Sequence, residues 1–109
     1  MATIWVRFTA EGWHHWPGAP EHRAYLGVSH RHLFHVRVEV PVSHDQRDIE
    51  FHDLLDTARE LWGDGDHQGR SCETLARELG EALVRLLPVA WVEVEVSEDG
   101  EAGATVKAT

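Results

Sequence analysis

Cysteine is almost absent from this chain, whose 109 residues include only Cys72. A single cysteine excludes an intrachain disulfide and a zinc site built from cysteine alone. Basic residues are also scarce, because 10 Lys and Arg against 19 Asp and Glu give a net charge of −9 with His neutral. Proteins that bind nucleic acid through its phosphates need clustered Lys and Arg, so we expect no nucleic-acid partner.

Long hydrophobic runs are missing as well. No apolar stretch approaches the roughly 20 residues of a membrane span, and the first residues lack the basic start and apolar core of a signal peptide. We therefore expect a cytoplasmic protein with no membrane partner. The length fits one domain, residues 1–109. A domain of this size buries a modest core, so we expect self-association if its sheet has open edges.

Histidine, in contrast, is plentiful, with nine in the chain. Since cysteine is scarce, a transition metal would be held here by imidazole and carboxylate. His30 and His32 lead directly into an alternating segment in which Phe34 to Val42 repeat an apolar residue at every second position. This period of two indicates a strand with one buried face. Both imidazoles then point to the same side, close enough to share one metal ion.

The rest of the pattern predicts an α+β domain. Alternation predicts strands at 2–10, 31–42, 90–96 and, more weakly, 102–108, while the Gly- and Pro-containing segment 11–29 is expected to be a long loop. Helical spacing predicts helices at 51–62 and from about 71 to 87. The order is ββααββ, which we interpret as a four-stranded antiparallel sheet with two helices on one face. The other face is expected to contact another subunit, because it carries Trp5 and Trp91.

This order and its histidine motifs resemble the tunnelling-fold family, specifically 6-pyruvoyl-tetrahydropterin synthase and bacterial 6-carboxytetrahydropterin synthase. The resemblance rests on Phe8-Thr9-Ala10 followed by a histidine, then His30-Arg31-His32 at the start of the second strand. It implies zinc ligands His14, His30 and His32, with His15 as the rival to His14. It also implies a trimer or hexamer. Three histidines with an open fourth position are typical of catalytic zinc, which would polarise a substrate oxygen.

The resemblance implies further site residues. Asp66 and His67 match a catalytic dyad, although an Asp in a Gly-rich loop also simply favours a turn. Glu95 matches a glutamate that binds the pterin ring, and a carboxylate can accept two hydrogen bonds from such an edge. Glu93 has the same parity, so alternation does not choose between these two. Leu26 stands where the family has a cysteine general base, and leucine cannot abstract a proton.

Two functions stay open at this point. The first is a zinc-dependent lyase or hydrolase that acts on a pterin or related heterocycle without the standard synthase activity. The second is a non-catalytic zinc protein that binds a pterin- or purine-like ligand, which the missing loop cysteine favours. A purely structural zinc site would require a fourth ligand from the protein. We place the enzyme first, because three neutral imidazoles leave zinc electrophilic.

Overall fold

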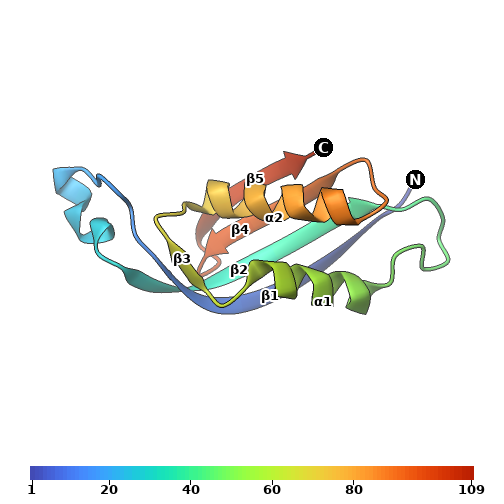
Figure 1. Ribbon diagram of the computed structural model, residues 1–109, viewed down its shortest axis with the longest axis horizontal. Coiled ribbons are helices and arrows are strands. Elements are labelled where there is room, and N and C mark those ends of the chain that lie inside the picture. The colour runs from blue at the N-terminus through green and yellow to red at the C-terminus, as the bar shows by residue number, and fades with distance from the viewer.

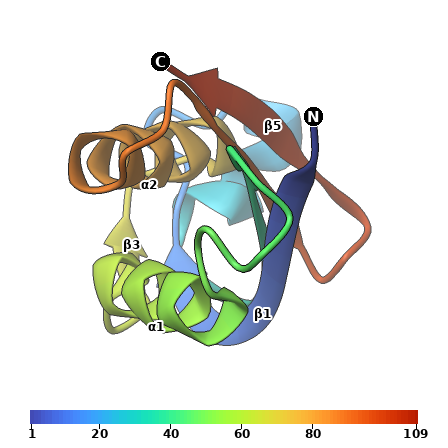
Figure 2. The ribbon, with the colours of Figure 1, turned by 90° about the vertical axis from the view of Figure 1, so that its right-hand side faces the viewer.

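The computed structural model describes residues 1–109 and has an α+β architecture (Figure 1). Five strands form one curled, mixed sheet in the order β3-β1-β2-β4-β5. β1 (Thr3–His14), β2 (His30–Pro41), β4 (Val92–Glu98) and β5 (Ala102–Ala108) are antiparallel neighbours. Helices α1 (Phe51–Trp62) and α2 (Cys72–Leu86) lie on the same side of the sheet (Figure 2). The four predicted strands and two predicted helices are therefore all present.

The sheet differs from the prediction by one strand. Residues 66–68, predicted as part of a glycine-rich break, form β3 (Asp66–Gln68), which pairs parallel with the end of β1. The sheet is therefore five-stranded and mixed, not four-stranded and antiparallel. Gly65 makes this possible: its φ is +93°, and a Cβ there would lie 2.5 Å from the carbonyl oxygen of Glu11. Only glycine tolerates both this backbone conformation and such a close approach.

The long loop predicted at 11–29 is also shorter and more ordered than expected. β1 continues to His14 because its last residues pair with the start of β2, as far as His14 opposite His30. A 3-10 helix, η1 (Glu21–Gly27), occupies the middle of the connection and contains no buried residue. This arm extends away from the sheet and helices (blue, at the left of Figure 1). The extension of β1 is what places His14 beside the H-x-H motif.

The core lies between the sheet and the two helices. Alternate strand residues face the helices, and those of β2 and β4 are fully buried: Val36, Val38, Val40, Val92, Val94 and Val96. The helices contribute the apolar stripes predicted from their spacing: Leu54, Ala58 and Trp62 from α1, and Leu75, Ala76, Leu79 and Leu83 from α2. Ser71 is the N-cap of α2 and accepts a hydrogen bond from the backbone N–H of Thr74 at 3.1 Å. This cap fixes where α2 begins.

The opposite face of the sheet has no helix over it. Trp5 is 51% exposed there, and the guanidinium carbons of Arg7 and Arg37 lie 5.3 and 5.1 Å from its ring centroid. Arg37 also pairs with Glu39 at 2.8 Å. This face thus mixes aromatic and charged side chains, as the sequence predicts. Neither helix has the length and apolar character needed to span a membrane.

Candidate metal centre

The three predicted metal ligands lie together where β1 ends and β2 begins. His14 is the cross-strand partner of His30, and Gly12 is the partner of His32. The three imidazole ring centroids are 4.7, 4.9 and 5.2 Å apart. Because positions 30 and 32 share one side of β2, both rings point toward the ring of His14, the last residue of β1. The structure therefore brings His14 together with two histidines that lie 16 and 18 residues further along the chain.

His15, the rival ligand, is not part of this group. The side chains that can share one metal ion include His14 and not its neighbour. The backbone N–H of His15 instead donates to the carbonyl of Gln68 at 2.8 Å. Its ring is turned to Gly69, where an added Cβ would lie 3.6 Å from Nε2. Successive strand residues point in different directions, which explains why only one of the two adjacent histidines joins the group.

Each of the three rings is held through its Nδ1 nitrogen. His14 donates to the carbonyl of Arg70 at 2.9 Å, and His30 donates to the carbonyl of Val28 at 2.9 Å. His32 Nδ1 lies 2.8 Å from Oδ2 of Asp99. The His32 contact and the backbone N–H of Leu33 hold the pKa of Asp99 below its usual value, so this carboxylate acts as an acceptor. A proton on Nδ1 leaves Nε2 as the free lone pair, which is the arrangement that orients metal-binding histidines.

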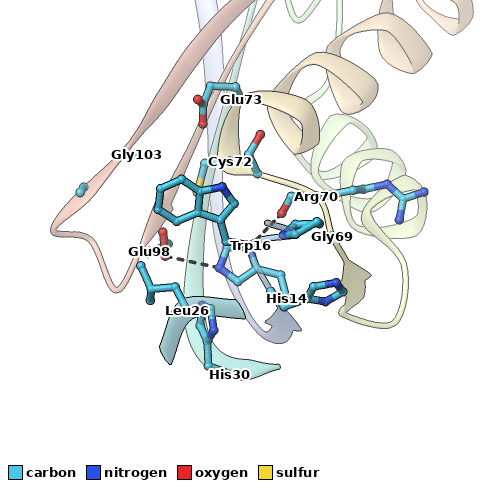
Figure 3. A pocket seen from close by; sticks show the side chains of 14 residues that line it. His14, Trp16, Leu26, His30, Gly69, Arg70, Cys72, Glu73, Glu98 and Gly103 are labelled. Atoms are coloured by element: carbon cyan, nitrogen blue, oxygen red, sulfur yellow. Dashed lines mark hydrogen bonds and ion pairs between the residues drawn. The ribbon is translucent and has the colours of Figure 1, made fainter. Parts of the chain in front are cut away.

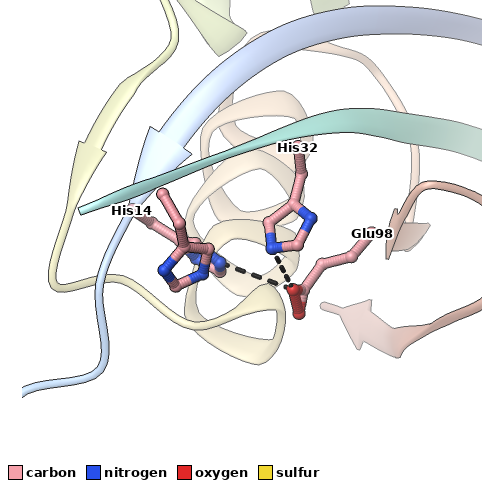
Figure 4. A group of neighbouring side chains, drawn as sticks. His14, His32 and Glu98 are labelled. Atoms are coloured by element: carbon pink, nitrogen blue, oxygen red, sulfur yellow. Dashed lines mark ion pairs between the residues drawn. The ribbon is translucent and has the colours of Figure 1, made fainter. Parts of the chain in front are cut away.

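Glu98 is a fourth candidate ligand that the sequence analysis missed. Its Oε2 lies 2.8 Å from Nε2 of His32 and 3.5 Å from Nε2 of His14 (Figure 4). Asp99 and Gly100 follow it as the central residues of the β4–β5 turn, both at positive φ, as expected for Asp-Gly in a tight hairpin. A signal was nevertheless available, because Glu98 continues the inward parity of the β4 valines.

The four side chains fit a transition-metal ion. One ligand atom from each of His14, His30, His32 and Glu98 lies within 4.8 Å of the others. Tetrahedral zinc bonds of 2.0–2.1 Å place ligand atoms about 3.3 Å apart, so small side-chain rotations would close the group. The buried Nε2 of His32 has no hydrogen-bond partner although it lies 2.8 Å from Oε2 of Glu98. These two atoms, a ring nitrogen and a carboxylate oxygen, are better arranged to bind one cation between them than to bind each other.

A cavity of about 330 Å³ adjoins this group (Figure 3). Its walls come from the β1–β2 connection with the strand ends that flank it, from the segment that leads from Gly69 into the first turn of α2, and from the β4–β5 hairpin. Trp16, which is 47% exposed, contributes an aromatic surface. His14, His30 and Glu98 also line the cavity, so a molecule bound there would contact the metal group.

Two cavity residues bear on the chemistry. Leu26 lines the cavity and offers no proton-transfer group. Cys72 lines it as well, from the first turn of α2. Burial, reinforced by the carboxylates of Glu98 and Glu73, raises the pKa of the Cys72 thiol to about 12. This thiol is therefore protonated at neutral pH, and a buried protonated thiol is a poor nucleophile.

The predicted dyad residues are adjacent in β3 but are not joined. Asp66 is exposed, whereas His67 is 5% exposed and packs against Phe34 and Trp62 with ring centroids 5.2 and 4.5 Å away. No hydrogen bond links the two side chains, because neighbouring strand residues point to opposite faces. Burial lowers the pKa of His67, helped by nearby His14. The catalytic role of this pair stays a prediction.

The structure separates Glu95 from the metal group. Its register partners are Arg37 on β2 and Thr105 on β5. Its side chain is exposed on the helix-free face, beside a niche that Arg7 and His35 also line. Glu98 lies three residues further along the chain, so it faces the other side of the sheet. Within one chain, Glu95 therefore cannot contact a ligand bound in the cavity beside the histidines.

No protein-family model matches the chain, and comparison with curated proteins finds no match. The resemblance to the pterin synthases therefore stays a prediction based on the motifs themselves.

Proposed function

We propose that this protein is a zinc-dependent relative of the 6-pyruvoyl-tetrahydropterin synthases that acts on a pterin or related heterocycle as a diverged lyase or hydrolase. One observation carries the proposal: His14, His30, His32 and Glu98 converge at the wall of a cavity large enough for a small molecule. Cavities of about 300 Å³ and above are the usual size of small-molecule sites. A zinc ion held there would supply Lewis-acid polarisation of a substrate oxygen.

The reaction proposed here differs from that of the standard synthase. Leu26 and the protonated Cys72 leave the cavity without a thiolate base. His67 does not line the cavity, and the Phe34 ring lies against both His67 and His14, with centroid distances of 5.2 and 5.3 Å. Water attack or a single proton shift needs fewer proton-transfer groups than a reaction with bases on both faces of the substrate. We therefore propose chemistry of this simpler kind.

Glu98 supports the alternative function, a non-catalytic zinc protein that binds a pterin- or purine-like ligand. A carboxylate in the fourth position leaves no ligand site open unless it moves or the coordination expands. A purely structural centre is less well supported, because Glu98 lines the cavity and its side chain is 34% exposed. A metal at this place would be reachable from the cavity side.

The proposal includes assembly into a trimer or hexamer. The edge of β5 has no neighbouring strand, and the helix-free face exposes Trp5. Such edges and patches attract pairing with another copy. Glu95 would contact a heterocycle only if assembly brought the helix-free face of one copy to the cavity of another. Sedimentation at micromolar concentration measures this directly, and a monomer would contradict the assembly.

The test of function combines metal analysis, ligand binding and turnover. Zinc-loaded protein is dialysed against neopterin and is separately incubated with dihydroneopterin triphosphate, with products separated by chromatography. We expect about one zinc per chain, measurable neopterin binding and little turnover of the triphosphate. Efficient synthase activity would contradict the diverged reaction. Loss of neopterin binding in His30→Ala/His32→Ala, with binding retained in Glu95→Gln, would assign the ligand to the cavity of a single chain.

A further inference from the structure

The cavity beside the metal group contains acidic side chains and no free Lys or Arg, although the imidazole of His15 also lines it. Glu73 and Glu98 both line it. Arg70 is the only Lys or Arg in its wall, and its guanidinium is engaged elsewhere: Nε donates to Glu78 at 3.0 Å and Nη1 donates to the carbonyl of His67 at 3.4 Å. Figure 3 shows this guanidinium turned away from Trp16 and Glu98. The part of Arg70 that serves the site is its carbonyl, which holds His14.

A bound metal ion does not reverse this balance. Three neutral imidazoles add no charge, and a divalent cation is balanced by the carboxylates of Glu98 and Glu73. Proteins that bind polyphosphates surround them with Lys, Arg or several backbone N–H groups. The N-terminus of α2 also lines this cavity, but Glu73 in its first turn places a carboxylate beside those N–H groups. The remaining cavity wall offers aromatic and apolar surface from Trp16, Pro17 and Leu26. Aromatic side chains pack well against flat rings.

We propose that this cavity selects a flat ligand without phosphate groups, of zero or positive charge, and rejects phosphorylated forms of the same ring. The inference rests on the proposed function, because it assumes a ring bound beside the metal group. It adds a specificity determinant, Glu73, which stands in the first turn of α2 at the cavity wall. Like charges brought together at a binding site discriminate strongly against the wrong partner.

Equilibrium dialysis of zinc-loaded protein against neopterin and neopterin triphosphate tests this inference. Zinc content is measured after each dialysis, so that chelation by the triphosphate is detected separately. We expect wild type to bind neopterin at least about tenfold more tightly than its triphosphate. Glu73→Arg should raise triphosphate affinity about tenfold, and Glu73→Gln should give a smaller gain in the same direction.

Glu81→Arg is the matched control. It makes the same charge change on an exposed position of the same helix, about 12 Å along the axis from Glu73. That distance exceeds the Debye length of about 10 Å at 0.1 M salt, so its effect should stay below about twofold. Equal gains in Glu73→Arg and Glu81→Arg would overturn the assignment of specificity to Glu73.

The outcomes separate this inference from the proposed function. If wild type binds both compounds and prefers the triphosphate, the charge selection is wrong while the heterocycle site stands. If wild type retains its zinc and binds neither compound, the proposed function fails, and this inference fails with it.

Discussion

Histidine occupies two contrasting environments around Phe34. His14 and His67 are almost equally buried, at 7% and 5% exposure, and both rings lie against Phe34. His14, however, donates from Nδ1 to the carbonyl of Arg70 and directs Nε2 toward other candidate ligands. His67 has a buried Nε2 with no partner, and burial lowers its pKa. The partner on the second ring nitrogen, rather than depth of burial, distinguishes the metal-type histidine from the packed one.

Of the changes that test this contrast between histidines, removing two candidate ligands should have the largest effect, which is on zinc content. We expect the double variant His30→Ala/His32→Ala to lose stoichiometric zinc, because a single imidazole and one carboxylate hold zinc poorly. His67→Phe, which changes the packed histidine, should keep about one zinc per chain. Elemental analysis after exhaustive dialysis measures both. A full complement of zinc in the double variant would place the metal elsewhere.

Removing the acceptor behind one ligand should give an intermediate effect. In Asp99→Gly, glycine can adopt the backbone φ of +57° at position 99, but His32 Nδ1 loses its hydrogen-bond partner. Loss of such a supporting hydrogen bond weakens metal binding about 10–100-fold. Asp99→Asn, which retains an acceptor oxygen, should recover part of this loss. Zinc affinity is read by competition with a chelating dye, with exposed Glu101→Gln in the same hairpin as the control. Equal affinities in Asp99→Gly and wild type would refute the role of Asp99.

The smallest effect concerns the packed histidine and pH. Because burial lowers the pKa of His67 in the folded state, the unfolded chain binds more protons as pH falls below the ordinary histidine value of about 6.5. The free energy of unfolding of wild type therefore decreases as the pH falls below about 6.5. His67→Phe should show a shallower loss between about pH 7.5 and about pH 5.5 than wild type. Urea denaturation of the metal-free proteins measures the difference, and identical slopes would contradict it.

Much of this architecture was predictable because it follows from local periodicity. Alternation in Val36, Val38 and Val40 predicted β2, and the same parity placed His30 and His32 on one side. The helix predicted from about 71 to 87 lies within one residue of α2 at each end; Ser71 caps its start and it ends before Pro88. β3 was not predictable in this way. It depends on a close contact between Gly65 and Glu11, which are far apart in the sequence, and no local pattern indicates such a contact.

The site was predictable only in its histidines. Glu98 was missed because it directly precedes Asp99-Gly100, a pair typical of a turn, which hides the parity that continues from Val96. The carbonyls of Val28 and Arg70 that hold two of the rings carry no side-chain signal at all. Glu95 was assigned by resemblance, and its parity with Glu93 already pointed to the face opposite the valines.

X-ray absorption at the zinc edge tests the central claim most directly. Zinc-loaded wild type should show three imidazole nitrogens and one carboxylate oxygen at roughly 2.0–2.1 Å. Glu98→Gln should keep the three imidazoles and alter only the oxygen contribution. Fewer than three imidazoles, or a sulfur ligand at about 2.3 Å from Cys72, would contradict a centre built from His14, His30, His32 and Glu98.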